Sequence, residues 1–151
     1  MDNMVLTGDD VFKINDTIID ELANGETVSV TFPNDINNVE KGKNGIGLYA
    51  KNEAGSISET VFRVKRGGVN DRFLNNILNS MLNDLASFTL MKMEFIKRLG
   101  DGEGTIFSDT YVLKGGIFSK FPETRGDSTG SVEQAIAVYT VKCTSVSIIK
   151  G

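Results

Sequence analysis

The sequence contains no histidine and no tryptophan, and Cys143 is the single cysteine among its 151 residues. Histidine is the usual general base near neutral pH and a common ligand of zinc, copper and iron. Its absence excludes Ser-His-Asp and Cys-His catalysis, and we expect no transition-metal centre. One cysteine cannot form an internal disulfide, so we expect a hydrophobic core to hold the fold, which a chain of this length can bury.

Positive charge and long apolar runs are also scarce. Lys and Arg number 16 against 20 Asp and Glu, which gives a net charge of −4. Such a chain offers no basic surface for phosphates, so we expect no specific nucleic-acid binding. No run approaches the roughly 18 apolar residues of a membrane helix, and residues 1–10 lack the pattern of a signal peptide. We therefore expect a soluble protein without a membrane partner.

What the sequence does contain is a series of short segments that alternate apolar and polar residues between Gly-, Asn-, Asp- and Ser-rich turns. This pattern is typical of strands, and it predicts a mainly β fold. Asn15-Asp16 between two short apolar runs predicts a tight hairpin. The expected strands are 11–14, 17–19, 27–32, 56–66, 88–98, 105–114, 117–121 and 132–149, with Gly115-Gly116 as a turn.

Two segments depart from this pattern. Residues 33–55 form a polar, Gly- and Asn-rich excursion that is too long for a hairpin turn, and its second half, 46–51, has the composition of a strand. We expect an arm at about 34–55 that protrudes from the body and needs a partner to order it. Residues 70–86 carry apolar side chains at helical spacing, with Asn70 as the expected N-cap, and predict one helix packed on the sheet.

Three motifs resemble ligand-binding sequences, but none has the residues or the specificity that such a site requires. Residues 101–106 resemble part of a calcium loop, but the first and last ligand positions fall on Leu99 and Thr110. The glycines and lysines at 41–47 lack the spacing of a phosphate loop and precede no helix. Arg125-Gly126-Asp127 has the sequence of an integrin-recognition tripeptide, but a match of three residues is expected by chance. We predict no metal, no cofactor and no catalytic residue.

One acid pair remains as an alternative. Glu94 and Asp109 lie on neighbouring predicted strands, and carboxylates that face each other can act as acid and base. Solvated carboxylates on a sheet surface explain the same residues. Cys143 lies in an apolar strand, without a histidine to activate it, and is interpreted as a buried core residue.

The order of these segments resembles the tail tube proteins of bacteriophages, particularly the short form of contractile-tailed phages and related prophage particles. The resemblance rests on the hairpin at 12–19, the segment 22–26 leading into the strand 28–32, the long loop around residues 41–45, and the Asn70-Asp71 start of a leucine-rich helix. The long final strand also matches. The resemblance covers most of the chain.

The resemblance implies a single domain over residues 1–151: a β-sandwich, or curled barrel-like sheet, with one flanking helix and a long protruding loop. Six copies would form a ring by continuing their sheets into one barrel, and stacked rings would form a tube through which DNA passes. Partners would be further copies, with sheath, baseplate or tail-terminator and tape measure proteins. The protein would be assembled in the bacterial cytoplasm and located in the virion tail.

The resemblance also assigns roles to individual residues. The strand residues Ser29, Thr31, Lys92 and Glu94 are of the type expected on a face that lines a water-filled channel. The arm would contact the neighbouring ring through Asn34, Asp35, Ile36, Asn37, Val39, Lys41, Lys43, Ile46, Leu48, Tyr49 and Lys51.

Three other functions remain open from the sequence. A tube protein of a bacterial contractile secretion system would share the architecture. A monomeric β-sandwich that binds a sugar or other ligand would use the Gly-rich loops, although none of them carries a Trp. A small hydrolase would depend on Glu94 and Asp109.

Overall fold

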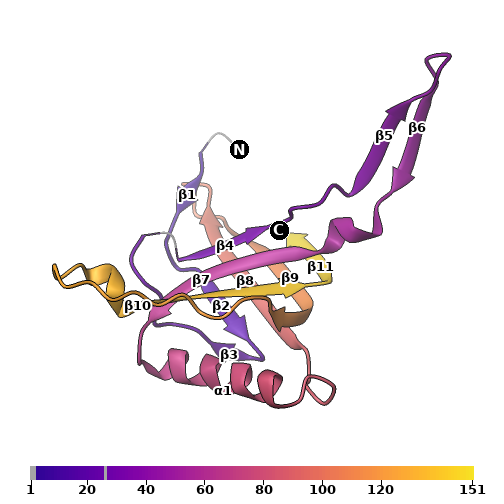
Figure 1. Ribbon diagram of the computed structural model, residues 1–151. Helices are drawn as coiled ribbons and strands as arrows, with labels where there is room; N and C mark the ends of the chain where they lie inside the picture. Colours follow the sequence, from indigo (N-terminus) through magenta and orange to yellow (C-terminus); the bar gives the residue numbers. More distant parts are fainter. Residues whose placement is uncertain (1–2, 26) are drawn as a thin grey trace.

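A computed structural model describes residues 3–25 and 27–151 of the chain (Figure 1). Strands account for 47% of the residues and helix for 16%, which confirms a mainly β fold with one flanking α-helix. Met1 and Asp2, which belong to the predicted domain, and Glu26, which belongs to the segment before the strand at 28–32, lie outside the described residues.

The strands are β1 (Val5–Leu6), β2 (Val11–Ile14), β3 (Thr17–Ile18), β4 (Val28–Thr31), β5 (Asn37–Lys41), β6 (Gly47–Lys51), β7 (Ser58–Lys65), β8 (Met91–Gly100), β9 (Ile106–Phe118), β10 (Ile136–Cys143) and β11 (Ser145–Lys150). The helix α1 runs over Val69–Asn83, and two 3-10 turns, η1 (Glu53–Ser56) and η2 (Val132–Ala135), complete the elements. The predicted hairpin at Asn15-Asp16 is confirmed, since both residues have positive φ (49° and 65°), as its tight turn requires.

Nine strands form one antiparallel sheet in the order β3-β2-β8-β9-β10-β7-β4, with β1 paired to β8 and β11 to β9. The sheet folds back over itself. Phe12 of β2 and Phe62 of β7 lie four strands apart in this order, yet their rings are 5.0 Å apart between centroids. Over the described residues the sheet therefore forms two layers around a shared core, and it does not close into a barrel.

The core follows from alternation along the strands. In β7 every second side chain is buried, and β10 follows the same alternation except that Thr140 is buried as well; in register the two strands place Phe62 opposite Tyr139 and Thr60 opposite Val141. Phe62 and Tyr139 stack with ring centroids 5.8 Å apart. The buried apolar residues that pack into one cluster are Phe12, Ile14, Ile19, Phe62, Val64, Leu74, Leu78, Met91, Met93, Leu113, Phe118, Ala137, Tyr139, Val141 and Cys143.

The predicted turn at Gly115-Gly116 is wrong, because β9 runs through both glycines. Its first part pairs with β8 and β11, and its last residues pair with β10, so this strand joins the two layers. Gly115 has φ +72°, and a shift of register between Met91 and Met93 marks a bulge at this point. Gly116 must be small, since a Cβ there would lie 3.0 Å from Cys143 Sγ.

The predicted single final strand at 132–149 is also wrong. Its first residues form η2, and Thr144 separates β10 from β11. The N–H of Thr144 donates to Lys114 O at 3.2 Å. At this residue the chain leaves the layer of β7 and β10 and pairs along β9 in the other layer. Apolar and polar residues alternate in the same way before and after Thr144, so the sequence pattern does not reveal the change of layer.

The helix is found where the leucine spacing predicted it, with Leu74 and Leu78 buried, but both ends differ from the prediction. Asn70 is not the N-cap: Gly68 takes that position. The Asn70 side chain is buried, and its Oδ1 accepts the backbone N–H groups of Asp20 and Glu21 at 3.1 and 2.8 Å. Asn70 therefore ties the helix to the segment that follows β3.

At its other end the helix stops at Asn83 and not at residue 86. Asp84 has extended backbone angles, and its Oδ1 accepts the N–H of Ala86 at 3.1 Å, a local bond that favours a turn over a further helical turn. Phe88 donates its N–H to Leu85 O at 3.2 Å. Because this turn extends to residue 88, the next strand begins at Met91 and not at the predicted Phe88.

Candidate assembly surfaces

The arm predicted at about 34–55 is a β-hairpin, and it projects from one end of the body (Figure 1). The sequence predicted a strand only in its second half, but β5 pairs with β6 along the whole length, from Asn37 opposite Lys51 to Lys41 opposite Gly47. At the tip Gly45 has φ +80°, and the N–H of Gly42 donates to Ile46 O at 2.6 Å. The tip is thus a defined turn.

The arm leaves its apolar side chains in solvent. Every residue of β5 and β6 is exposed. Val39 and Tyr49 form a cross-strand pair in which the two residues are 66% and 77% exposed. A two-stranded hairpin is only marginally stable by itself in water. The arm residues listed from the sequence are all exposed here, and Ile36, Ile46 and Leu48 add to its uncovered apolar surface.

The root of the arm is held more firmly than its tip. Asn52 donates its backbone N–H to Ile36 O at 3.0 Å, and the Asn34 side chain donates to Ala54 O at 3.3 Å. Gly55 is buried against the opposite segment: a Cβ there would lie 2.5 Å from Ile36 Cα and 2.7 Å from Asp35 O. The two chains of the arm therefore meet the body at a close backbone contact that only glycine allows.

An apolar groove of about 390 Å³ lies beside this root. Phe32 from the end of β4 and Ile36 from the arm face Val146 and Ile148 of β11 across it. Two strands near the groove have one unpaired edge: β4 pairs only with β7, and β11 only with β9, among the described residues. Unpaired edges next to apolar surface are sites where another chain can add a strand.

The four residues proposed from the sequence to line a channel face away from the core, but they are not together. Ser29 and Thr31 lie on β4, whereas Lys92 and Glu94 lie on β8, four strands away in the sheet. Because the sheet folds back, these two pairs lie on opposite outer surfaces. Lys92 and Glu94 form an ion pair at 3.3 Å. Channel lining stays a prediction, and one surface cannot present both pairs.

The acid pair of the hydrolase alternative is not formed. Register places Glu94 opposite Val112 and Asp109 opposite Lys97, so the two carboxylates lie on opposite faces of the sheet. No group of three His, Cys, Asp or Glu that could hold a metal occurs in residues 3–25 and 27–151. Burial raises the pKa of the Cys143 thiol to about 11, which keeps it protonated and unreactive.

The calcium-like segment is a hydrogen-bonded turn. Asp101 Oδ1 accepts the N–H groups of Glu103 and Thr105 at 2.7 and 3.1 Å. The bond from Glu103 is the main cause that holds the pKa of this carboxyl below its ordinary value. The side chain is thus used by its own loop, as in other Asx turns.

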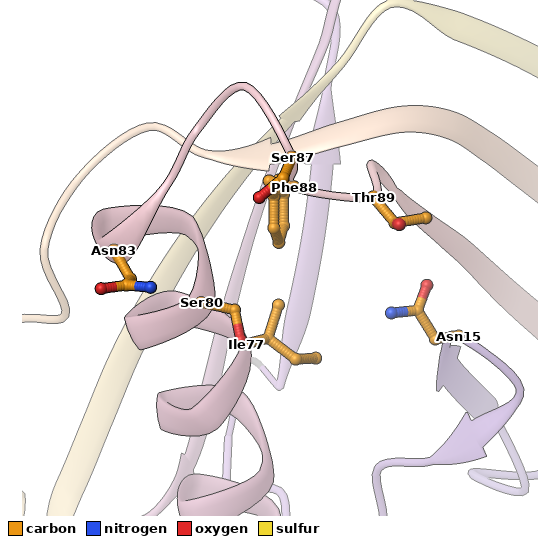
Figure 2. Close-up of a pocket in the computed structure, with 7 residues that line it drawn as sticks. All are labelled: Asn15, Ile77, Ser80, Asn83, Ser87, Phe88 and Thr89. Atoms are coloured by element: carbon orange, nitrogen blue, oxygen red, sulfur yellow. The ribbon is translucent and has the colours of Figure 1, made fainter.

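A second hollow lies beside the end of α1, which is at the other end of the molecule from the arm in Figure 1. We call this hollow the foot pocket (Figure 2). It has a volume of about 440 Å³ and lies between the C-terminal half of α1, the loop that follows it, and the β2–β3 turn. Apart from Ile77 and Phe88, its lining consists of neutral amides and hydroxyls. The lining residues are Asn15, Ile77, Ser80, Asn83, Ser87, Phe88 and Thr89.

The comparisons with solved structures show what the fold is similar to. A chain of the sheath–tube complex of an extracellular contractile injection system, PVC, in its extended state superimposes with a TM-score of 0.65 at 12% identity, covering 94% of this chain and 88% of that chain. This protein has a tail-tube-like fold. The sheath/tube terminator of the same system gives 0.64 at 12% identity over 93% and 92% of the two chains.

A third similar structure is the tube-terminating cap of the anti-feeding prophage, with a TM-score of 0.61, 8% identity and coverage of 94% and 88%. The three similar structures thus come from a sheath–tube complex, a sheath/tube terminator and a tube-terminating cap. No family model and no curated protein sequence matches this chain. The likeness is thus one of fold, detected through the shape of the chain.

Two surfaces escaped the sequence analysis. The apolar groove combines Phe32 and Ile36 with Val146 and Ile148, which lie more than 100 positions later in the chain. The foot pocket likewise joins the turn at Asn15 to the end of α1. The exposed Leu85, in the loop that contributes Ser87 and Phe88 to the foot pocket, was the available signal for this surface, but the predicted helix extended to residue 86 and included it. No described helix is long and apolar enough to cross a membrane.

Proposed function

We propose that this chain is a non-enzymatic structural subunit that assembles with copies of itself into stacked hexameric rings, forming the tube of a contractile tail. The observation that carries the proposal is the arm: an ordered hairpin with exposed apolar side chains on a body whose fold is tail-tube-like. Burial of such side chains in another copy is favourable by about 25 cal/mol per Å². The arm therefore reaches a subunit of the adjacent ring.

The unpaired edges of β4 and β11 supply the contacts within a ring. Addition of a strand from the next subunit satisfies N–H and C=O groups that are otherwise left to water, and a cyclic arrangement leaves no free edge. The apolar groove between Phe32 and Ile148 lies beside these edges and is covered by the same neighbour. The ring has a central hole whose surface carries no excess of positive charge, so DNA passes without binding.

The phage tail and the injection-system tube are two versions of this proposal. The similar structures come from contractile injection systems, which favours the second version, whereas DNA delivery requires the first. In both versions the subunit is part of an extracellular particle after assembly in a bacterial cytoplasm, with a sheath and a terminator as further partners. Particles purified with their contents separate the versions: nuclease-protected DNA behind the tube identifies a phage tail.

Negative-stain microscopy of the purified protein tests the proposal. We expect rings or tubes with a central hole at high protein concentration. Deletion of residues 41–46, which form the tip of the arm, is expected to impair stacking while leaving soluble, folded subunits or single rings. A sample that stays monomeric at every concentration would contradict the proposed function, and loss of folded protein in the deletion variant would contradict the assignment of the arm.

A further inference from the structure

Two exposed carboxylates directly follow residues that line the foot pocket. Asp16 follows the lining residue Asn15, Asp84 follows the lining residue Asn83, and both are exposed. The last carbonyls of α1 add a partial negative charge, and no basic residue lies in the last turn of this helix to offset it. Lys92, whose backbone N–H donates to Asn15 Oδ1 at 3.0 Å, has its ammonium group in an ion pair with Glu94 at 3.3 Å.

The tip of the arm has the opposite charge. Lys41 and Lys43 lie at or beside the turn, and Gly45 in the same turn carries no side chain. Within the described residues, neither lysine is within 4.0 Å of a carboxylate, whereas Lys51 at the root pairs with Glu53 at 3.8 Å. Two ammonium groups without an ion-pair partner are thus carried on the most extended part of the molecule.

Apolar side chains accompany both charged surfaces. Ile77 and Phe88 line the foot pocket, and Leu85, in the loop that follows α1, is 60% exposed. On the arm, Ile46 and Leu48 follow Lys43 within five residues and are 65% and 53% exposed. Each surface therefore offers a charged centre with uncovered aliphatic groups next to it, which is the composition that two complementary docking surfaces require.

The arm and the loop after α1 lie at opposite ends of the molecule in Figure 1, so the two surfaces do not meet within one copy. A contact between different surfaces on two copies is heterologous, and repetition of such a contact builds an open stack. The two complementary surfaces are therefore placed where a head-to-tail series of subunits needs them.

We propose that the arm tip of one subunit seats on the foot pocket of a subunit in the adjacent ring, with Lys41 and Lys43 beside Asp16 and Asp84. The hydroxyls and amides that line the pocket accept hydrogen bonds from the ammonium groups, and Ile77 and Phe88 in the pocket cover Ile46 and Leu48. This contact rests on the proposed tube function and names the partner surface of the arm, a second copy of this chain.

A charge swap tests the contact. Lys43→Glu and Asp84→Lys, each alone, place like charges together. We expect each to raise the protein concentration needed for tube formation about fivefold, in line with roughly 1 kcal/mol for an exposed ion pair. The double variant restores opposite charges and is expected to assemble within about twofold of the unchanged protein. Light scattering and microscopy measure the protein concentration at which tubes form in the single and the double variants. Chemical denaturation confirms that the monomers remain folded.

Lys65→Glu is the matched control, because it makes the same change of charge at an exposed position of β7 away from both surfaces. It is expected to assemble like the unchanged protein. If tubes form normally in both single variants, the proposed contact is wrong while the tube function stands. If the single variants fail and the double variant fails equally, the two residues do not meet, and the contact is also wrong. If the unchanged protein never assembles, both proposals fail.

A cross-link provides an independent readout. Lys43→Cys and Asp84→Cys in the same chain are expected to form disulfides between copies under mild oxidation with oxidised glutathione, giving a ladder of multimers on a denaturing gel. The natural Cys143 is buried and does not compete. Either cysteine alone is expected to give no ladder. A ladder of equal intensity from Lys65→Cys with Asp84→Cys would overturn the contact, because it would show random collision.

Discussion

The body and the arm contain the same kind of cross-strand pair in opposite surroundings. In the body, Phe62 faces Tyr139 in register, and both are at most 1% exposed. In the arm, Val39 faces Tyr49 in register, and both are more than 60% exposed. In both places two antiparallel strands pair in register, so the difference lies in what covers the pair: the folded sheet covers the first pair, and the second pair is left in solvent.

The largest expected effect is in the body. Phe62→Ala removes a ring that contacts Phe12 and Tyr139 at centroid distances of 5.0 and 5.8 Å. We expect a loss of about 3–5 kcal/mol in the free energy of unfolding, because the cavity is walled by two rigid layers. Urea denaturation of the monomer measures it. A loss below about 1 kcal/mol would show that the two layers are not packed as described.

The second effect depends on pH and also belongs to the body. Burial raises the pKa of Cys143 to about 11, above its ordinary value of 9.0. The folded state then keeps a proton that the unfolded chain loses, so stability is fully present below pH 9 and falls as pH rises to about 11. Over this pH range the free energy of unfolding is expected to fall by roughly 3 kcal/mol. Comparison of the denaturation midpoints of the natural protein and Cys143→Ala checks it, since the variant is expected to show a shallower decline over that range.

The third effect lies where the arm joins the body. Gly55→Ala places a Cβ against the backbone of Ile36 and Asp35, and we expect a loss of about 1–3 kcal/mol in stability or a displaced arm. Gly126→Ala is the control, because nothing lies within 4 Å of its Cβ position. Thermal unfolding and protease digestion of the arm report the two outcomes. If Gly55→Ala and Gly126→Ala showed the same unfolding temperature and the same rate of arm digestion, the close backbone contact at Gly55 would be contradicted.

The smallest expected effect on the monomer is in the arm. Tyr49→Ala removes a side chain that is 77% exposed and is expected to change the free energy of unfolding by no more than about 0.5 kcal/mol. The same variant is expected to form fewer and shorter tubes, which microscopy quantifies. A destabilised monomer with normal tubes would reverse the comparison between body and arm.

Local patterns account for most of what could be predicted from the sequence. Alternation identified β4 and β7, leucine spacing identified α1, and Asn15-Asp16 identified a hairpin, because each signal depends on neighbours within a few residues. The errors arose where distant contacts decide. Asn70 has the composition of an N-cap, but the N–H groups of Asp20 and Glu21 occupy its side chain.

The same limit applies to the candidate surfaces. The sequence located the arm, since its length and polarity are local properties. It did not locate the apolar groove or the foot pocket, whose residues come together only after the sheet folds back. The change of layer at Thr144 and the passage of β9 through Gly115 and Gly116 have no local signature, because a strand and a bent strand show the same alternation.

The root of the arm determines how the molecule responds to force. The two strands of the hairpin continue into β4 and β7, which lie side by side in the sheet, and β7 is held along its whole length by eight register pairs with β10. Ladder hydrogen bonds run across the strands, so a pull on the arm directed along β7 loads all of these pairs together and does not open them one by one. In the proposed tube, tension on the arm would thus be transmitted to the longest ladder of that layer.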